Sequence, residues 1–366
     1  MALQPAPTWV SRLYQDMLSR EVAIFMTTAP ERQATAADHR TAPSGSRQQR
    51  VSVKRWPHIL RRSARQFKRH DLSDQAAALT YFGVLAIFPG ILVLVSIFGL
   101  LGHSTTQTFL DNLQEIAPSG VNSFLRTVIA QVQGRAGAAS IAAIVGIVIA
   151  LWSASGYVAA FMRASNRIYG VSEGRPITRT APVRVGVTVA MTIMLVISVL
   201  IIVVTGPVAR QVGDALGIGD AAVLAWSIAK WPVLLVVVWL MFSLLYWACP
   251  NVKQSGRPGI TPGAAIAIGL WLVCSGLFAL YVSFSGSYNK TYGSLATVII
   301  FLVWLWISNI ALLMGLEFDA ERQRERLLQA GLPPDLEPFV EVRDTRKMDE
   351  PERRRISAAT ARFRRS

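Results

Sequence analysis

The chain has 366 residues, a length at which a soluble protein would form two or three domains. Its composition excludes that interpretation: 52% of the residues are hydrophobic, 16% are charged, and several apolar runs reach the roughly 20 residues that span about 30 Å of hydrocarbon. The 37 basic residues outnumber the 22 acidic ones, but they flank the apolar runs, where arginines set topology and meet anionic headgroups. We therefore expect an all-α, polytopic membrane protein with no nucleic-acid partner.

Residues 1–52 precede the membrane domain. The segment 28–50 is poor in apolar residues, which is typical of disorder, and the short cluster VAIFM at 22–26 lacks the basic flank of a signal peptide. We expect a disordered or weakly amphipathic cytoplasmic extension. The alternative is an extension without a role, or a gene model that begins upstream of the true start.

A basic amphipathic helix is predicted next, in KRWPHILRRSARQFKRH at 54–70. Trp56, Ile59, Leu60 and Phe67 share one helical stripe among arginines, a pattern typical of a helix lying in the headgroup region. An ordinary helix packed on the membrane bundle would have the same pattern.

Six apolar runs are the predicted spans of a domain at 53–322: residues 76–102, 138–162, 185–209, 231–249, 263–284 and 294–316. Pro89 is expected to kink the first. No run contains Asp, Glu, Lys, Arg or His, which disfavours a transporter built on a buried carboxylate. Small residues such as Gly263, Ala267 and Gly269 indicate close packing of helices.

Loop charges predict the orientation of the spans. Basic residues are frequent before span one, between spans two and three and after span four, whereas the opposite side has only Arg126, Arg135, Arg210, Lys230 and Lys290. Because basic loops favour the cytoplasm, both termini should be cytoplasmic.

Glu317 directly follows the last span. We expect it at the cytoplasmic boundary, in an interfacial ion pair with an arginine of the loop at 163–184, rather than inside the membrane as a catalytic or ion-carrying group. The charged tail at 323–366 is expected to be a solvated cytoplasmic helix that fades into disorder.

Signatures of catalysis and cofactor binding are missing. The four histidines are scattered, Cys249 and Cys274 form no CxxC pair, and neither a GxSxG nor a phosphate-binding GxxxxGK[ST] motif occurs. We expect no catalytic residue, no metal, no cofactor and no enzymatic activity.

Two spans end alike, in SASGYVAAFMRASNRIYG at 153–170 and CSGLFALYVSFSGSYNKTYG at 274–293. The predicted topology places these endings on opposite sides, so spans one to three and four to six could form a 3+3 inverted-topology repeat. Coincidence is the alternative. Tyr288, Tyr292 and Gly293 would form the outer turn.

The first of these endings also contains candidate lipid contacts. Arg163 and Arg167 are one helical turn apart, and two guanidinium groups with Asn166 between them could bind the phosphate of a lipid headgroup. The alternative is that these arginines only set topology.

The chain resembles the YihY/BrkB family of bacterial inner-membrane proteins over about residues 55–322. The resemblance rests on AAALTYFGVLAIFPGILVL at 76–94, on residues 153–170, on PGAAIAIGLWLVCSGLFALYV at 262–282 and on TYGSLATVIIFLVWLWISNIALLMGLEFDAE at 291–321. Where members commonly have two tyrosines, this chain has Tyr81-Phe82, which puts a role for a second hydroxyl in doubt.

The resemblance implies a six-helix protein of the bacterial inner membrane linked to envelope integrity, serum resistance and, in some members, lipid or lipopolysaccharide traffic. We therefore expect envelope lipid handling or transport, with anionic lipids and proteins of a lipid-transport system as partners. A scaffold that recruits proteins is the second hypothesis. A ribonuclease, a label regarded as a misassignment for the family, ranks last. The sequence does not specify an oligomeric state.

Overall fold

A computed structural model describes residues 55–100, 139–203, 220–253, 261–284, 295–331, 333 and 337–363. Only the backbone is described for 87–100, 139–147 and 149–150 and for positions 203, 220, 222, 295, 297, 362 and 363. All of these residues belong to one unit, Gln49–Ser366.

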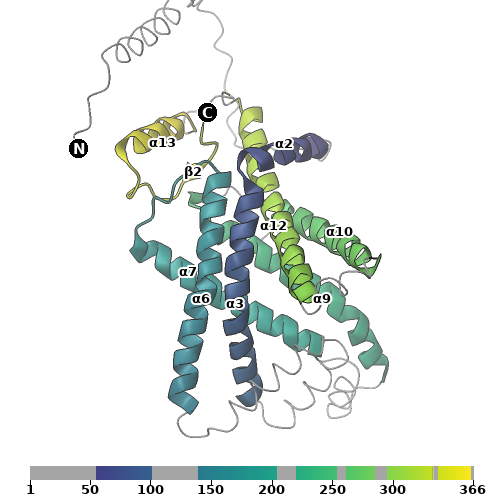
Figure 1. The fold of residues 1–366 in the computed structure, drawn as a ribbon. Coiled ribbons are helices and arrows are strands. Elements are labelled where there is room, and N and C mark those ends of the chain that lie inside the picture. Colours follow the sequence, from purple (N-terminus) through teal and green to yellow (C-terminus); the bar gives the residue numbers. More distant parts are fainter. Residues whose placement is uncertain are drawn as a thin grey trace, which may run out of the picture. The chain divides into compact units, whose positions relative to one another are not determined.

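The described chain is almost entirely helical (Figure 1), as expected. Its helices are α2 (Trp56–Arg69), α3 (Leu72–Leu100), α6 (Ala139–Ile168), α7 (Ile177–Val203), α9 (Asp220–Ala248), α10 (Pro262–Phe284), α12 (Leu295–Gln329) and α13 (Glu350–Phe363). Two short strands, β1 (Val252–Lys253) and β2 (Glu341–Val342), pair antiparallel with Val252 opposite Val342. Each predicted span overlaps one of the six long helices.

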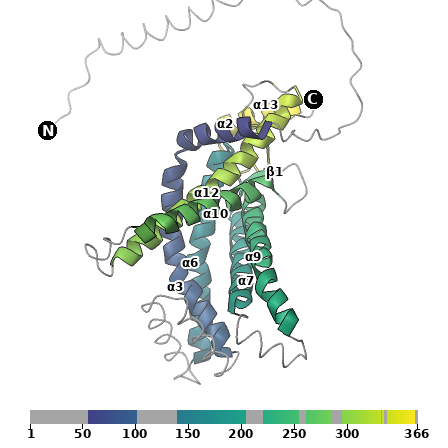
Figure 2. The ribbon, with the colours of Figure 1, turned by 90° about the vertical axis from the view of Figure 1, so that its right-hand side faces the viewer.

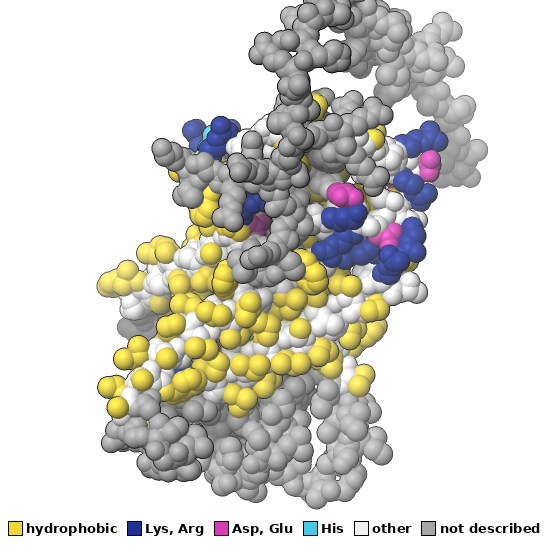
Figure 3. All heavy atoms as spheres, turned by 180° about the vertical axis from the view of Figure 1, so that it is seen from behind, with side chains coloured by type: hydrophobic (Ala, Val, Ile, Leu, Met, Phe, Trp, Pro, Cys, Tyr) yellow, Lys and Arg dark blue, Asp and Glu magenta, His cyan; other side chains and the backbone are white. Residues whose placement is uncertain are grey.

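Four helical segments among the described residues are long and apolar enough to cross a membrane: Ile177–Ile202, Val223–Ala248, Pro262–Phe284 and Val298–Gln329. Large apolar side chains on these helices and on α6 are exposed, including Trp152 at 72% and Phe284 at 81%. Seen from behind, hydrophobic side chains cover much of the described body, and most basic and acidic ones gather near one end (Figure 3). An apolar surface of this extent requires lipid around it, so the chain is a multi-pass membrane protein.

Small residues bring the helices together in two places. α3 packs along α6, where Gly156 faces the ring of Phe82. α10 packs along α12 (Figure 2), where Gly263 and Gly315 approach so closely that a Cβ on either would overlap the carbonyl oxygen of the other. Gly269 faces open space, so its predicted role in packing is wrong.

Six helix termini lie together at one end of the helical bundle. They are the N-termini of α3, α7 and α10 and the C-termini of α6, α9 and α12. Side-chain contacts tie these ends together, such as Arg167 with Asp71 at 2.6 Å and the Gly263 amide with Asp319 at 2.9 Å. α2 and α13 lie at this same end (Figures 1 and 2). We call α2 with residues 169–176, 249–253 and 337–363 the polar cap.

The C-terminal tail differs from the expectation of a solvated helix fading into disorder. α12 continues to Gln329, and residues 337–363 pack against the rest of the polar cap, with β2 paired to β1 and the side chains of Phe339, Val340 and Ile356 buried. These few apolar residues within a charged sequence are enough to dock the segment, because β1 offers a strand edge for backbone pairing.

Three sequence predictions remain untested. α3 continues past position 89, but the side chain of Pro89 is outside the described part, so the kink stays a prediction. Tyr288, Tyr292 and Gly293 also lie outside the described residues. For the repeat, α3 packs extensively along α6, whereas α9 and α10, the corresponding pair of the second half, share a smaller contact.

Candidate functional site

A row of three ion pairs connects α2 and its flanking residues to the C-terminal part of α12. Three acids recur every fourth residue on one face of α12 and are buried there, and each pairs with a basic residue of α2 or of the positions directly before and after it. The pairs are Glu317 with His70 (3.0 Å), Glu321 with Arg62 (2.7 Å) and Glu325 with Arg55 (2.6 Å). Because an unpaired buried carboxylate is costly, these partners fix α2 across the end of α12.

Glu317 therefore has a different partner from the one expected, since His70 contacts it and no arginine of residues 163–184 does. The reason is the corner between α2 and α3, where Asp71 has a φ of 50°, a left-handed conformation that Asp tolerates better than most residues. This corner places His70 over α12. The hydrogen bond that the His70 ring donates to the Glu317 carboxylate raises the pKa of His70 above its ordinary value of 6.5, against the opposing effect of burial.

The apolar stripe of α2 packs on the bundle, as in the second of the two interpretations of its sequence pattern. Ile59 is buried, and the ring of Trp56 meets that of Phe318 edge-on at 5.6 Å. Leu60, at 40% exposed, is the stripe residue that points outward.

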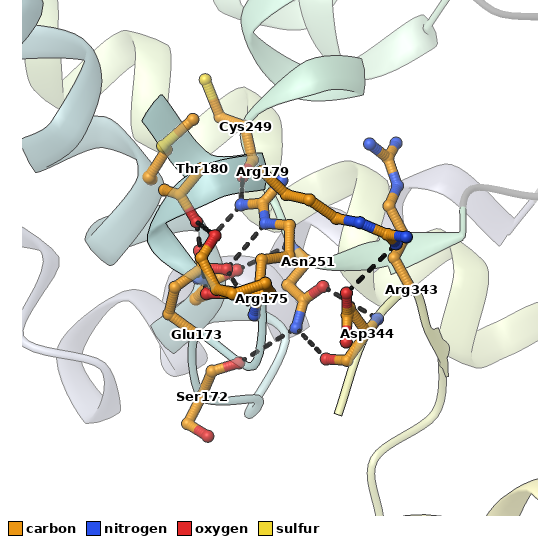
Figure 4. Close-up of polar contacts among 12 residues, drawn as sticks. Ser172, Glu173, Arg175, Arg179, Thr180, Cys249, Asn251, Arg343 and Asp344 are labelled. Carbon is orange, nitrogen blue, oxygen red and sulfur yellow. Dashed lines mark hydrogen bonds and ion pairs between the residues drawn. The ribbon is translucent and has the colours of Figure 1, made fainter. Parts of the chain in front are cut away.

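A second polar centre forms around Asn251, which is fully buried where α9 has ended (Figure 4). Its side-chain nitrogen donates to the carbonyl oxygens of Asp344 (2.8 Å) and Ser172 (3.3 Å), and its side-chain oxygen accepts from the Asp344 amide (3.2 Å). One side chain thus holds three segments together: the α6–α7 turn, the end of α9 and the C-terminal tail. No local pattern in the sequence identifies Asn251 as such a residue.

Arg175 completes this centre from the α6–α7 turn (Figure 4). Its guanidinium donates two hydrogen bonds, of 2.6 and 2.7 Å, to the Glu173 carboxylate. It also donates to the carbonyl oxygen of Cys249 at 2.6 Å. Arg175 is 5% exposed, so it cannot meet a lipid or a soluble ligand without leaving these partners. In the sequence it was one of several loop arginines that predict topology, and its structural role was missed.

The three residues predicted to contact a lipid headgroup, Arg163, Asn166 and Arg167, lie in two different environments. Asn166 is buried: its nitrogen donates to Glu173 (2.9 Å) and its oxygen accepts from the Asn251 amide (2.7 Å). It therefore belongs to the Asn251 centre, and the prediction that it contacts a headgroup disagrees with the structure. Position 166 is rotated about 100° from Arg167 and about 60° from Arg163 around the helix axis, which is enough to turn it from the exposed side toward Glu173 and Asn251.

Arg163 and Arg167 are exposed on one side of α6. The Arg163 guanidinium lies over the ring of Phe82, 5.7 Å from its centroid, and Arg167 pairs with Asp71 at 2.6 Å. Both members of the second pair are about half exposed, and such pairs are weak and exchange readily. Both guanidinium groups can therefore meet an anionic group at the surface.

Within the helical body, a neutral polar chain links three helices. Tyr157 of α6 donates to Asn309 of α12 at 2.9 Å, and Asn309 donates to Thr80 of α3 at 3.1 Å. These hydrogen bonds satisfy one another, and polar pairs of this kind hold helices together in membranes. In the part of the chain that the structure describes, no three His, Cys, Asp or Glu side chains gather as metal ligands.

Comparison with known proteins gives consistent matches. The family model described as virulence factor BrkB matches residues 63–337. A ribonuclease-like protein of Bacillus subtilis, YfkH, is 29% identical over 274 residues, which are 75% of this chain and 96% of that protein. No solved structure matches.

Two UPF0761 membrane proteins are also similar. The one from Alkalilimnicola ehrlichii is 28% identical over 70% of this chain and 56% of its own length, so the chain spans little more than half of that relative. The one from Mannheimia succiniciproducens is 25% identical over 73% of this chain and 90% of its own length. The ribonuclease-like name of the first relative stands apart from these membrane-protein names.

Proposed function

The chain belongs to the virulence factor BrkB family, and from that premise we propose that it is a non-enzymatic inner-membrane protein that handles or transports envelope lipid. In this proposal α3, α6, α7, α9, α10 and α12 are six spans. The polar cap, rich in arginine, faces the cytoplasm with both termini, because basic loops favour that side.

The observation that carries this proposal is the exposed pair Arg163 and Arg167 at the end of α6. Both lie where the apolar surface of the helix body gives way to the polar cap, a boundary that this proposal assigns to the depth of lipid headgroups. Guanidinium groups bind phosphate through paired hydrogen bonds, so this surface is suited to an anionic headgroup.

A deletion strain lacking this gene and its paralogues tests the proposal. We expect altered lipid composition or an altered distribution of lipid between the membranes, restored by the wild-type gene and not by Arg163→Ala/Arg167→Ala. A matched control, Arg354→Ala/Arg355→Ala, removes two exposed charges of α13 and should restore normal lipids. Unchanged lipids in the deletion strain would count against the proposal.

A scaffold that moves nothing is the second candidate, and the exposed run Arg353, Arg354 and Arg355 on the docked α13 favours it. Deleting the whole tail is a poor test, because loss of Asp344 would remove two of the three hydrogen bonds of the buried Asn251 side chain. The triple substitution of these arginines by alanine is cleaner. A scaffold should lose partner recruitment and function, whereas a lipid handler should keep its function.

The 3+3 inverted repeat stays part of the proposal, with spans one to three related to spans four to six. An experimental structure whose halves fail to superpose about an axis in the membrane plane would end it. A ribonuclease ranks last, and RNA cleavage by rigorously purified protein that a point mutation abolishes would revive it.

A further inference from the structure

A cavity of about 500 Å³ opens on the polar cap beside α2, on a surface that the lipid proposal does not use. The side chains that line it are His58, Arg62, Arg65, Gln66, Arg69 and Arg324. Its volume lies within the range of about 300 to 1,000 Å³ that is common for small-molecule sites.

The arginines reach the cavity for a simple helical reason. Arg62, Arg65 and Arg69 are spaced three and then four residues apart, so they lie on one face of α2. Ile59 and Ser63 are buried against the bundle, and this arginine face lies beside them, with Arg62 next to the buried Glu321 and Arg65 and Arg69 exposed. Arg324 comes from α12, which α2 crosses, and closes the cavity from the other side.

Positive charge is in excess at this cavity. Glu321 neutralises part of it, since it pairs with Arg62 at 2.7 Å and lies 3.9 Å from Arg324. The guanidinium of Arg324 also lies over the ring of Phe339, 4.3 Å from its centroid. Among the described residues, no carboxylate lies within ion-pair distance of Arg65 or Arg69. Arg62 and Arg69 repel Arg324 across the cavity, and the carboxylates of Glu321 and Glu337 offset part of this repulsion.

Such an arrangement costs free energy unless an anion offsets the repulsion. Four guanidinium groups around one space offer many donors in planar forks, which fit the oxygens of a phosphate better than a lone carboxylate or a halide. Gln66 adds a neutral donor that is suited to a phosphate ester oxygen.

We propose that this cavity is a binding site for a phosphate group, carried either by a lipid headgroup or by a soluble phosphate compound. The lipid source rests on the proposed function, whereas the site itself does not. Arg65 and Arg69 supply the charge that no described acid neutralises, and Arg62 and Arg324 complete the ring of donors.

The test compares two double variants of the full-length chain in a nonionic detergent. Arg65→Gln/Arg69→Gln removes two charges from the cavity, and Arg61→Gln/Lys68→Gln removes two exposed charges from the same helix outside it. Each pair takes one charge from the last turn of α2, so effects on the helix dipole match. Equal melting temperatures would show that both variants fold.

Binding is measured by titration calorimetry with inorganic phosphate, with phosphatidic acid in mixed micelles, and with diacylglycerol micelles that lack phosphate. We expect the cavity variant to lose about tenfold or more in affinity for a phosphate-bearing probe, and the control variant to stay within about twofold. Equal losses in both variants, or none in either, would overturn the site.

Two further outcomes separate the site from the proposed function. Binding of inorganic phosphate but not of phosphatidic acid, dependent on Arg65 and Arg69, would support the site and count against its use for lipid. Binding of phosphatidic acid that is lost in Arg163→Ala/Arg167→Ala and kept in the cavity variant would support the lipid proposal and overturn the site.

Discussion

Replacing Asn251 by alanine should release the C-terminal tail from the polar cap. The substitution removes three side-chain hydrogen bonds, two to backbone groups of Asp344 and one to the carbonyl oxygen of Ser172. At about 1 kcal/mol each, the loss is about 3 kcal/mol, and it is greater if the buried backbone groups stay unsatisfied. Local opening of the tail should become roughly a hundredfold more frequent, since about 1.4 kcal/mol corresponds to a factor of ten.

Hydrogen exchange of the full-length chain in detergent measures this opening. The informative amides are those of Arg343 and Lys347, which donate to the carbonyl oxygens of Asn251 (3.0 Å) and Gly174 (2.9 Å). The matched control is Lys253→Ala, which breaks an ion pair with Glu341 on the surface of the same strand pair and should cost less than about 1 kcal/mol. Unchanged exchange in Asn251→Ala, or an equal increase in the control, would refute the reasoning.

Three other predictions concern pH, packing and topology. Because Glu317 raises the pKa of His70, protonated His70 stabilises the fold at low pH, and this contribution is lost as the pH rises above about 6.5. The melting temperature of the wild type should therefore fall across this pH range, and His70→Gln should reduce that pH dependence. Gly315→Ala should lower the free energy of unfolding by about 1 to 3 kcal/mol, because the added methyl group pushes α12 away from α10. Gly269→Ala should leave this free energy nearly unchanged, and thermal unfolding measures both variants. A cysteine at the exposed position Ser357, in a chain with its natural cysteines replaced, should react with impermeant maleimide only in inside-out vesicles, and labelling of intact cells would contradict a cytoplasmic cap.

The membrane helices could be predicted because length and composition are sufficient for them. An apolar run of about 20 residues has few alternatives to a helix that spans lipid. The family could also be recognised from the sequence, because the stretches at 76–94 and 291–321 resemble those of its members. The apolar stripe of α2, with its flanking arginines, correctly predicted a helix, but the pattern could not show whether lipid or α12 would cover the stripe.

The details of the polar cap could not be predicted, because they depend on contacts between distant segments. His70 meets Glu317 across 247 positions of sequence, and the corner at Asp71 that makes this contact has no strong local signal. Asn251 contacts Asp344 across 93 positions, and a lone asparagine after an apolar run is unremarkable. Asn166 was assigned to the surface by its neighbours, although a helix turns adjacent side chains to different sides.

The central claim is that the protein binds a phosphate-bearing lipid at Arg163 and Arg167, at the end of α6 beside the polar cap. Native mass spectrometry of the full-length chain released from mild detergent, beside Arg163→Ala/Arg167→Ala, tests it most directly. We predict that the wild type retains one class of phosphate-bearing lipid and that the double variant loses it. The same mixture of lipids on both proteins would contradict the claim and leave the two arginines as topology signals.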